Sequence, residues 1–249
     1  MTAPVFLCTR DQLDGDVVVL AGAEGHHGAD ARRMRPGERL RLTDGNGRVA
    51  DGVVTTATRG QLGVAVQSRS DVPAPTPRIT VVQALAKGDR AERAIEAMTE
   101  IGVDEFVPWA PQRAIVAWRG ERVDRGLARW RSAAAAAARQ SRRVWFPVVG
   151  ELADRAEVER RIAAATFAVV CHEAADAPLS GRAVPTTGEI VIVIGPEGGL
   201  DETELAGLAA AGGQPVRLGP TVLRTGTAGA AAAALLLAAS GRWAAVGDA

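Results

Sequence analysis

The chain has 249 residues, 47% of them hydrophobic and 23% charged, a composition typical of a folded globular protein rather than a disordered one. Its 29 basic and 29 acidic residues cancel, so any nucleic-acid-binding function must depend on local clusters of charge. Neither a secretory signal nor an apolar run of the about 20 residues that a membrane span requires is visible, which predicts a cytoplasmic protein without a membrane partner.

The first 72 residues predict a small β domain. Short segments that alternate polar and apolar residues are separated by turn signals, and they lie at 16–20, 39–43 and 63–67. One such signal is Asp44-Gly45-Asn46-Gly47. Three prolines within 73–77 then favour an extended connector over a helix or a central strand. We therefore expect a domain at 1–72, a linker at 73–78 and a second domain at 79–249.

Strands and helices alternate after the linker. Strands are predicted at 79–85, 104–109, 167–171, 189–194 and 215–218. Helices are predicted at 90–101, ending at Gly102, at 124–143, after Asp201, and from about Thr225. Asp201 is a good N-cap, and Glu204 three residues later completes a capping-box pattern. This alternation predicts an α/β fold with a mainly parallel sheet covered by helices.

Two glycine-rich turns follow predicted strands. The first is Gly195-Pro-Glu-Gly-Gly-Leu200, and the second begins at Gly219-Pro220. Ligands bind at such strand ends in open α/β sheets, and glycine lets the backbone approach a flat ligand closely. Each turn alone could equally be a simple tight turn. Neither fits the GxGxxG or Walker pattern, which disfavours dinucleotides and nucleoside triphosphates.

Together the two turns resemble the cofactor loops of SPOUT methyltransferases, whose usual forms are IGPEGG and LGxxxLRxET. Further segments resemble the RsmE subfamily: Gln83-Ala-Leu-Ala-Lys87, the helix with Glu92, Glu96 and Glu100, then Gly102, Pro108 and Gln112-Arg113. The stretch from His27 to Gly37, followed by Asp44-Gly45, is similar to the PUA-like RNA-binding domain of that subfamily. The resemblance spans nearly the whole chain.

The resemblance implies a C-terminal SPOUT domain with a deep trefoil knot, a small N-terminal PUA-like β-barrel domain, and a homodimer. The apolar helix at 227–239 could form the dimer interface or be buried in its own core. The implied reaction is S-adenosylmethionine-dependent methylation of N3 of one uridine in the RNA of the small ribosomal subunit. The implied cofactor-binding residues are His172, Ile194, Gly195, Pro196, Gly198, Gly199, Leu218, Gly219, Pro220, Leu223, Thr225 and Ala228.

The reaction requires removal of the N3 proton, because protonated uracil N3 is a poor nucleophile. The catalytic candidates are Glu197 as the base, and Arg113 or Arg224 to stabilise negative charge on the uracil oxygens. Alternatively, Glu197 braces its loop through backbone hydrogen bonds. The family commonly reads Arg-Thr-Glu-Thr where this chain has Gly226, so no carboxylate can act at that position. Relatives often read Glu-Gln-Ser where this chain has Arg139-Gln140-Ser141, a change that could shift RNA contacts.

Two clusters of arginine favour RNA binding independently of the family. Six arginines and no acidic residue lie between Arg125 and Phe146, together with Trp130 and Trp145, and five more arginines lie at 32–41. Arginine grips phosphate and tryptophan offers a stacking face, although a solvated basic surface is the alternative. The RNA-binding candidates are Arg32, Arg33, Lys87, Arg139, Arg142 and Arg143.

The sequence leaves three other interpretations open. The first is a SPOUT methyltransferase for another RNA position, such as a ribose 2′-hydroxyl of tRNA. The second is a non-catalytic RNA-binding factor for ribosome assembly, which Gly226 favours. A dinucleotide oxidoreductase is the least supported, because no Rossmann fingerprint is present. No metal site is expected, because adjacent His26 and His27 cannot readily face one ion and His172 lacks matching carboxylates.

Overall fold

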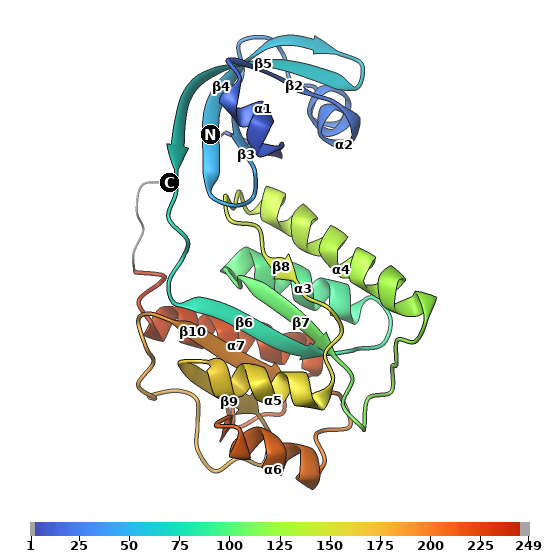
Figure 1. The fold of residues 1–249 in the computed structure, drawn as a ribbon, viewed down its shortest axis with the longest axis vertical. Coiled ribbons are helices and arrows are strands. Elements are labelled where there is room, and N and C mark those ends of the chain that lie inside the picture. Colours follow the sequence, from blue (N-terminus) through green and yellow to red (C-terminus); the bar gives the residue numbers. More distant parts are fainter. Residues whose placement is uncertain (1–2, 245–249) are drawn as a thin grey trace. The chain divides into compact units, whose positions relative to one another are not determined.

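A computed structural model describes residues 3–244 (Figure 1). The chain divides into two compact units, one of residues 1–74 with 138–146 and one of 75–137 with 147–249. No sequence pattern indicated that 138–146 belongs with the first unit. The boundaries expected at 72 and 79 stay predictions, and the expected ranges 1–72 and 79–249 extend beyond the described residues at both chain ends.

The first unit is built on a five-stranded sheet in the order β1-β3-β4-β5-β2. The strands are β1 (Val5–Leu7), β2 (Val17–Leu20), β3 (Arg39–Thr43), β4 (Arg48–Thr58) and β5 (Gln61–Asp71). β1 pairs with β3 in parallel, and the other pairings are antiparallel. Between the strands lie the short helices α1 (Arg10–Asp14) and α2 (Gly22–His26) and one π-helical turn, η1 (His27–Ala31). The three segments predicted as strands form β2, β3 and part of β5.

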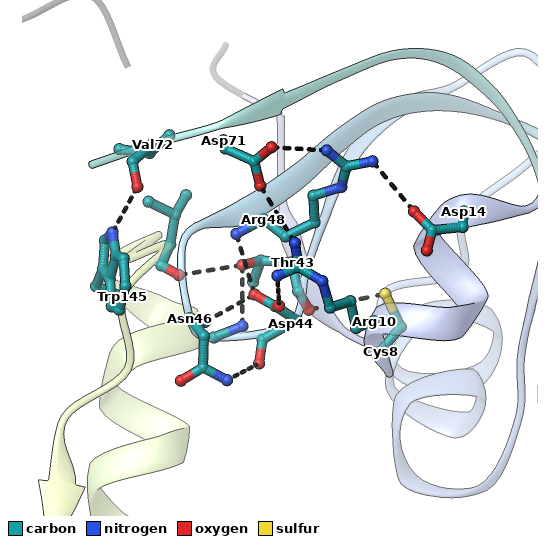
Figure 2. A network of polar contacts seen from close by, with 12 residues as sticks. Cys8, Arg10, Asp14, Thr43, Asp44, Asn46, Arg48, Asp71, Val72 and Trp145 are labelled. Atoms are coloured by element: carbon teal, nitrogen blue, oxygen red, sulfur yellow. Dashed lines mark hydrogen bonds and ion pairs between the residues drawn. The ribbon is translucent and has the colours of Figure 1, made fainter. Parts of the chain in front are cut away.

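The turn between β3 and β4 is held by the chain segment that follows α4. Asn46 N donates to Asp44 Oδ1 at 2.8 Å, as expected for an Asx turn. Gly47 has a φ of +90°, and a Cβ there would lie 2.6 Å from the Trp145 ring. The Trp145 indole N–H donates to the Val72 carbonyl at 3.0 Å, which ties the segment to the end of β5 (Figure 2). Glycine is therefore needed at position 47 for both its backbone angle and the close approach of Trp145.

The second unit contains a six-stranded sheet in the order β11-β9-β10-β6-β7-β8. The strands are β6 (Arg78–Ala84), β7 (Glu105–Trp109), β8 (Val148–Val149), β9 (Phe167–Cys171), β10 (Glu189–Ile194) and β11 (Gln214–Val216). Every pairing among them is parallel. The predicted α/β class with a mainly parallel sheet is confirmed.

Helices cover both faces of this sheet (Figure 1). They are α3 (Arg90–Ile101), α4 (Glu121–Gln140), α5 (Arg155–Ala164), α6 (Glu202–Ala210) and α7 (Thr225–Ala239). Alternate residues of β10 define the two faces: Ile190 and Ile192 pack in the core with α3, α4 and α7, while Val191 and Val193 pack with α5 and α6. β10 is therefore buried on both sides, which explains its unbroken apolar sequence.

Local signals located most helix ends correctly. α3 ends at Gly102, whose φ of +114° stops the helix, and α6 begins at Asp201 with both hydrogen bonds of the capping box to Glu204. The helix predicted at 124–143 was misplaced, since α4 spans Glu121–Gln140. Its earlier end has a backbone cause, because Arg142 has a φ of +60°, which no helical residue adopts. α5 and β8 were not predicted.

Helix α7 is buried along one face in its own unit. Ala228, Ala232, Ala233, Leu236 and Leu237 are 7% exposed or less and belong to the core shared with α3. One face of this helix is therefore buried in the core of its own unit, which was one of its two predicted roles. The dimer and the knot stay predictions. Within residues 3–244, no helix has the length and apolar content needed to cross a membrane.

Candidate active site

The residues expected to carry chemistry follow neighbouring strand ends. Because all strands of the second unit run parallel, the carboxyl ends of β6, β7, β9, β10 and β11 lie along one edge of the sheet. Lys87 follows β6, Arg113 follows β7 and His172 follows β9. Glu197 follows β10, and Arg224 follows β11 as the N-cap of α7. The fold therefore brings these segments to a common edge.

A pocket opens at the ends of β9, β10 and β11. Its volume is about 680 Å³, counting the solvent space at its mouth. It is lined by Cys171, His172, Glu173, Ile194, Gly195, Pro196, Gly199, Leu200, Arg217, Leu218, Gly219, Pro220, Thr221, Val222, Leu223, Thr225 and Ala228. All the residues predicted to bind the cofactor line this pocket except Gly198. The two glycine-rich turns thus form one cavity.

Gly198 contacts a neighbouring loop instead. A Cβ at Gly198 would lie 3.1 Å from the carbonyl oxygen of Arg113 and 3.4 Å from its Cβ. The absence of a side chain at Gly198 therefore allows the loop after β7 to pack against the loop after β10. The sequence indicated that this turn needs glycine. It did not indicate which neighbouring residue lies too close for a side chain at position 198.

Side chains from two other elements hold the first glycine-rich turn. The indole N–H of Trp109, at the end of β7, donates to the carbonyl of Ile194 at 3.1 Å. The hydroxyl of Thr225, at the start of α7, donates to the carbonyl of Gly195 at 3.1 Å. Trp109 is 1% exposed and Thr225 is 5% exposed, so both bonds are shielded from water. Sequence reasoning missed Trp109, because nothing in its local pattern reveals a partner on another strand.

The three catalytic candidates are exposed at this edge. Within residues 3–244, the side chains of Arg113, Glu197 and Arg224 make no hydrogen bond or ion pair. Glu197 therefore does not brace its loop, which was the alternative role for its carboxylate. Other arginines of the second unit form ion pairs, for example Arg161 with Glu105 at 3.0 Å. The unpaired charges at the edge are free to meet a substrate.

Both cysteines are free thiols, one in each unit. Burial raises the pKa of Cys171, in the pocket wall, to about 12. Burial, followed by the charges of Asp44 and Glu24, raises the pKa of Cys8 to about 12. Both thiols are therefore protonated at neutral pH and are poor nucleophiles, so the pocket has no thiolate chemistry.

The raised thiol pKa values predict that stability falls in alkali. Above pH 9, where an unfolded cysteine loses its proton, the folded state still holds it, so the free energy of unfolding decreases as pH rises from 9 towards 12. The expected slope is about 1.4 kcal/mol per pH unit for Cys171, and it is smaller for Cys8, which is less deeply buried and better screened by solvent. Urea unfolding between about pH 8 and 10.5 measures it. The chain has no tyrosine, and Lys87 is its one lysine, so few other groups titrate there.

Cys171→Ala and Cys8→Ala serve as the matched controls for this prediction. Each variant should remove its own share of the alkaline slope, and the double variant should remove most of it. A double variant that loses stability with pH as steeply as the natural protein would contradict the prediction.

Most of the predicted RNA-binding residues belong to the first unit. Arg32, Arg33, Arg139, Arg142 and Arg143 all lie there, whereas Lys87 lies in the second unit. Arg139 forms an ion pair with Glu24 of α2 at 3.2 Å. Because α2 leads directly into η1 and Arg32, this ion pair places Arg139 on the same part of the first unit as the segment that begins the cluster at 32–41.

The expected stacking surface was wrong for one of its two tryptophans. Trp130 is 0% exposed and packs edge-on against Trp118, so it cannot stack on a base. Trp145 is half-buried between the Gly47 turn and the Val72 carbonyl. Helix periodicity explains the error, because the arginine-rich segment has one solvent face and one core face, and Trp130 lies on the second.

No group of three or more His, Cys, Asp or Glu within residues 3–244 could hold a metal ion.

Comparison with known families shows which protein family this chain belongs to. A model described as an RNA methyltransferase domain matches residues 73–237, and one described as an RNA methyltransferase PUA domain matches residues 20–66. The chain belongs to the RsmE-type SPOUT RNA methyltransferases. Its relatives include the ribosomal RNA small subunit methyltransferase E of Mycobacterium tuberculosis, 47% identical over 98% of this chain and 94% of the relative. The Bacillus subtilis protein of the same name is 28% identical over 88% of this chain and 90% of the relative.

Solved structures agree with this RsmE-type assignment. The ribosomal RNA small subunit methyltransferase E of Neisseria gonorrhoeae, bound to S-adenosyl methionine, is 27% identical with a TM-score of 0.83, covering 95% of this chain and 98% of the other. A methyltransferase of Legionella pneumophila in complex with SAM is 26% identical with a TM-score of 0.83, covering 96% and 98%. The recognition made from the two glycine-rich turns is confirmed.

Proposed function

We propose that this RsmE-type protein uses S-adenosylmethionine to methylate N3 of one uridine in the 16S RNA of the small ribosomal subunit. One observation supports this most directly: both glycine-rich turns line a single pocket at the carboxyl edge of the parallel sheet. Relatives that match nearly the full chain are named ribosomal RNA small subunit methyltransferase E. The proposal includes action in the cytoplasm.

The residues of the pocket fit an adenosyl group. Ile194, Leu218 and Leu223 supply apolar surface for the faces of a purine, next to the backbone of Gly195 and Gly219. A Cβ at Gly219 would meet no atom within 4 Å, so the backbone there is open to a flat ligand. When bound, S-adenosylmethionine supplies an electrophilic methyl group. Trp109 and Thr225 keep the turn in shape by holding the carbonyls of Ile194 and Gly195.

The exposed charges at the pocket edge suit the activation of uracil. Glu197 accepts the N3 proton, and Arg113 and Arg224 stabilise the negative charge that develops on the two uracil oxygens. None of the three is neutralised by a partner within residues 3–244. Gly226, in the first turn of α7, excludes a carboxylate at that point, and nothing in its packing explains the glycine, since a Cβ would lie 3.5 Å from the Arg90 carbonyl.

The arginines of the first unit grip the RNA in this proposal. Arg32, Arg33 and Arg142 are exposed, and Arg139 and Arg143 lie in the same unit. Guanidinium groups bind phosphate oxygens in bidentate fashion, which positions the RNA without reading its sequence. Lys87 adds a compact charge at the end of β6.

We also propose a homodimer whose second unit contains the knotted chain characteristic of the family. Leu235 on α7 is 39% exposed, which leaves apolar surface on the outer side of that helix. Light scattering on the purified protein measures the mass of the assembly. The mass of a single chain at micromolar concentration would remove the dimer from the proposal.

Mass spectrometry of ribosomal RNA nucleosides tests the function. Cells that lack this protein should lose 3-methyluridine alone, and the natural protein should restore it. An unchanged nucleoside profile would overturn the proposal. The alternative that Gly226 raises is an RNA-binding assembly factor without catalysis. Calorimetry that finds neither S-adenosylmethionine nor S-adenosylhomocysteine bound would favour that alternative.

A further inference from the structure

Glu204 is a buried carboxylate that the proposed reaction does not use. It is 2% exposed and lies in the first turn of α6. Its Oε2 accepts a hydrogen bond from Asp201 N at 3.2 Å, and Asp201 Oδ1 accepts one from Glu204 N at 2.7 Å. These two bonds complete the capping box and occupy only one oxygen of the Glu204 carboxylate.

The other oxygen binds a loop far away in the sequence. Glu204 Oε1 accepts a hydrogen bond from the backbone N–H of Gln112 at 2.7 Å. Gln112 immediately precedes Arg113 in the loop after β7. One carboxylate therefore connects the loop that carries Arg113 to the segment that follows Glu197 and the first glycine-rich turn.

A second contact joins the same two loops. The carbonyl oxygen of Arg113 would lie 3.1 Å from a Cβ at Gly198, so the backbone of Arg113 packs directly on that glycine. Trp109, three residues before Gln112, donates to the carbonyl of Ile194 at 3.1 Å. The loop after β7 is thus attached to the β10 loop at both ends of the segment 109–113. Among the described residues 3–244, the Glu204 bond is the one that acts next to Arg113 through a charged acceptor.

We propose that Glu204 is a positioning residue that fixes the Arg113 loop against the turn at 195–199 and so aligns Arg113 with the reacting uracil. The proposal rests on the role of Arg113 in the proposed function. Hydrogen bonds to a carboxylate are stronger than neutral ones, and a buried one resists competition from water. A catalytic side chain has to be held to within about 0.5 Å, which an exposed loop does not achieve without such support.

The competing explanation is that Glu204 only caps α6. Capping involves Asp201 and Oε2, whereas positioning involves Gln112 and Oε1. The two roles use different atoms, so different variants separate them. Glu204→Gln keeps the size of the side chain but puts an NH2 donor in place of one carboxylate oxygen, so one of the two backbone N–H groups loses its acceptor. Asp201→Ala weakens the cap and leaves the bond to Gln112 in place.

A double-mutant cycle with Arg113→Ala tests the proposal. We expect Glu204→Gln to lower kcat for RNA methylation about 10- to 100-fold, since a misplacement of about 1 Å can cost 100-fold. KM for RNA and Kd for S-adenosylmethionine should change less than about 3-fold, because the bond touches neither ligand. In the double variant, Arg113→Ala should cause little additional loss, since the two residues act as a unit. Hydrogen exchange at the Gln112 amide should be faster in Glu204→Gln.

Three results would overturn the inference. The first is additive losses in the cycle, and the second is a loss of kcat in Asp201→Ala as large as in Glu204→Gln. The third is a kcat for Arg113→Ala equal to that of the natural protein while Glu204→Gln lowers kcat. This result would show that Glu204 does not act through Arg113. Failure of the proposed function is seen independently, since the natural protein would then not methylate the ribosomal RNA at all.

Discussion

Replacing Gly219 by valine is expected to weaken S-adenosylmethionine binding about 100-fold or more, which corresponds to about 2.7 kcal/mol, without unfolding the protein. Gly219 lines the pocket, and a Cβ there would meet no atom within 4 Å. The added side chain therefore costs the fold little and occupies space next to the ligand. Isothermal calorimetry measures the affinity, and thermal unfolding reports whether the fold is kept.

Two further variants make this result specific. Gly219→Ala adds a smaller group and should give an intermediate loss of affinity. Gly15→Val is the control, because Gly15 lies in the first unit with a φ of −83°, and its nearest neighbour to a Cβ is 3.5 Å away. It should bind the cofactor normally. Natural affinity in Gly219→Val would show that this pocket does not hold the cofactor.

Trp130→Ala is expected to lower the free energy of unfolding by about 3–5 kcal/mol. Trp130 is 0% exposed, and its ring meets that of Trp118 edge-on, with centroids 5.5 Å apart and planes at 78°. Gly126 makes room for this pair, since a Cβ there would lie 2.5 Å from Trp118. Truncation leaves a large cavity between α4 and the sheet. Urea denaturation measures the loss.

Trp130→Phe is the matched variant. The indole Nε1 of Trp130 is buried without a hydrogen-bond partner within residues 3–244, so phenylalanine removes an unsatisfied polar group while it keeps most of the packing. Its cost should stay below about 1.5 kcal/mol. RNA affinity should not change in Trp130→Phe, because the ring is inaccessible. A clear loss of RNA affinity in this folded variant would restore the stacking role.

Much of the second unit was predictable because its signals are local. Strands β9 and β10 and helix α3 begin and end at the predicted residues. Unbroken apolar runs, the Asp201–Glu204 cap and Gly102 each act within one or two turns of chain. The two glycine-rich turns were recognised by their combination, because each alone is common at strand ends. Segments without such signals, such as β8 and α5, were missed.

The pocket at the strand ends was predicted more completely than the contacts that support it. The pocket gathers both turns, as expected from strand ends on one edge of a parallel sheet. In contrast, the contact of Gly198 with Arg113 was not predicted, and its expected role in cofactor binding stays a prediction. A hydrogen bond to the backbone of a loop was one role predicted for Glu197, whereas in the structure Glu204 makes such a bond, to Gln112 N. The capping box already explained the presence of Glu204 in the sequence. Nothing in the local pattern indicated that its carboxylate has a second partner.

Local sequence patterns were enough to predict the α/β class, most helix and strand positions and the pair of turns that identify the family, because periodicity, capping and glycine angles depend on neighbours in the chain. Three features became visible from the folded chain alone: Glu204 accepts a hydrogen bond from Gln112, Trp130 is buried, and 138–146 belongs to the first unit. Each of these is a contact between segments far apart in sequence. Packing selects such partners, and no local pattern encodes them.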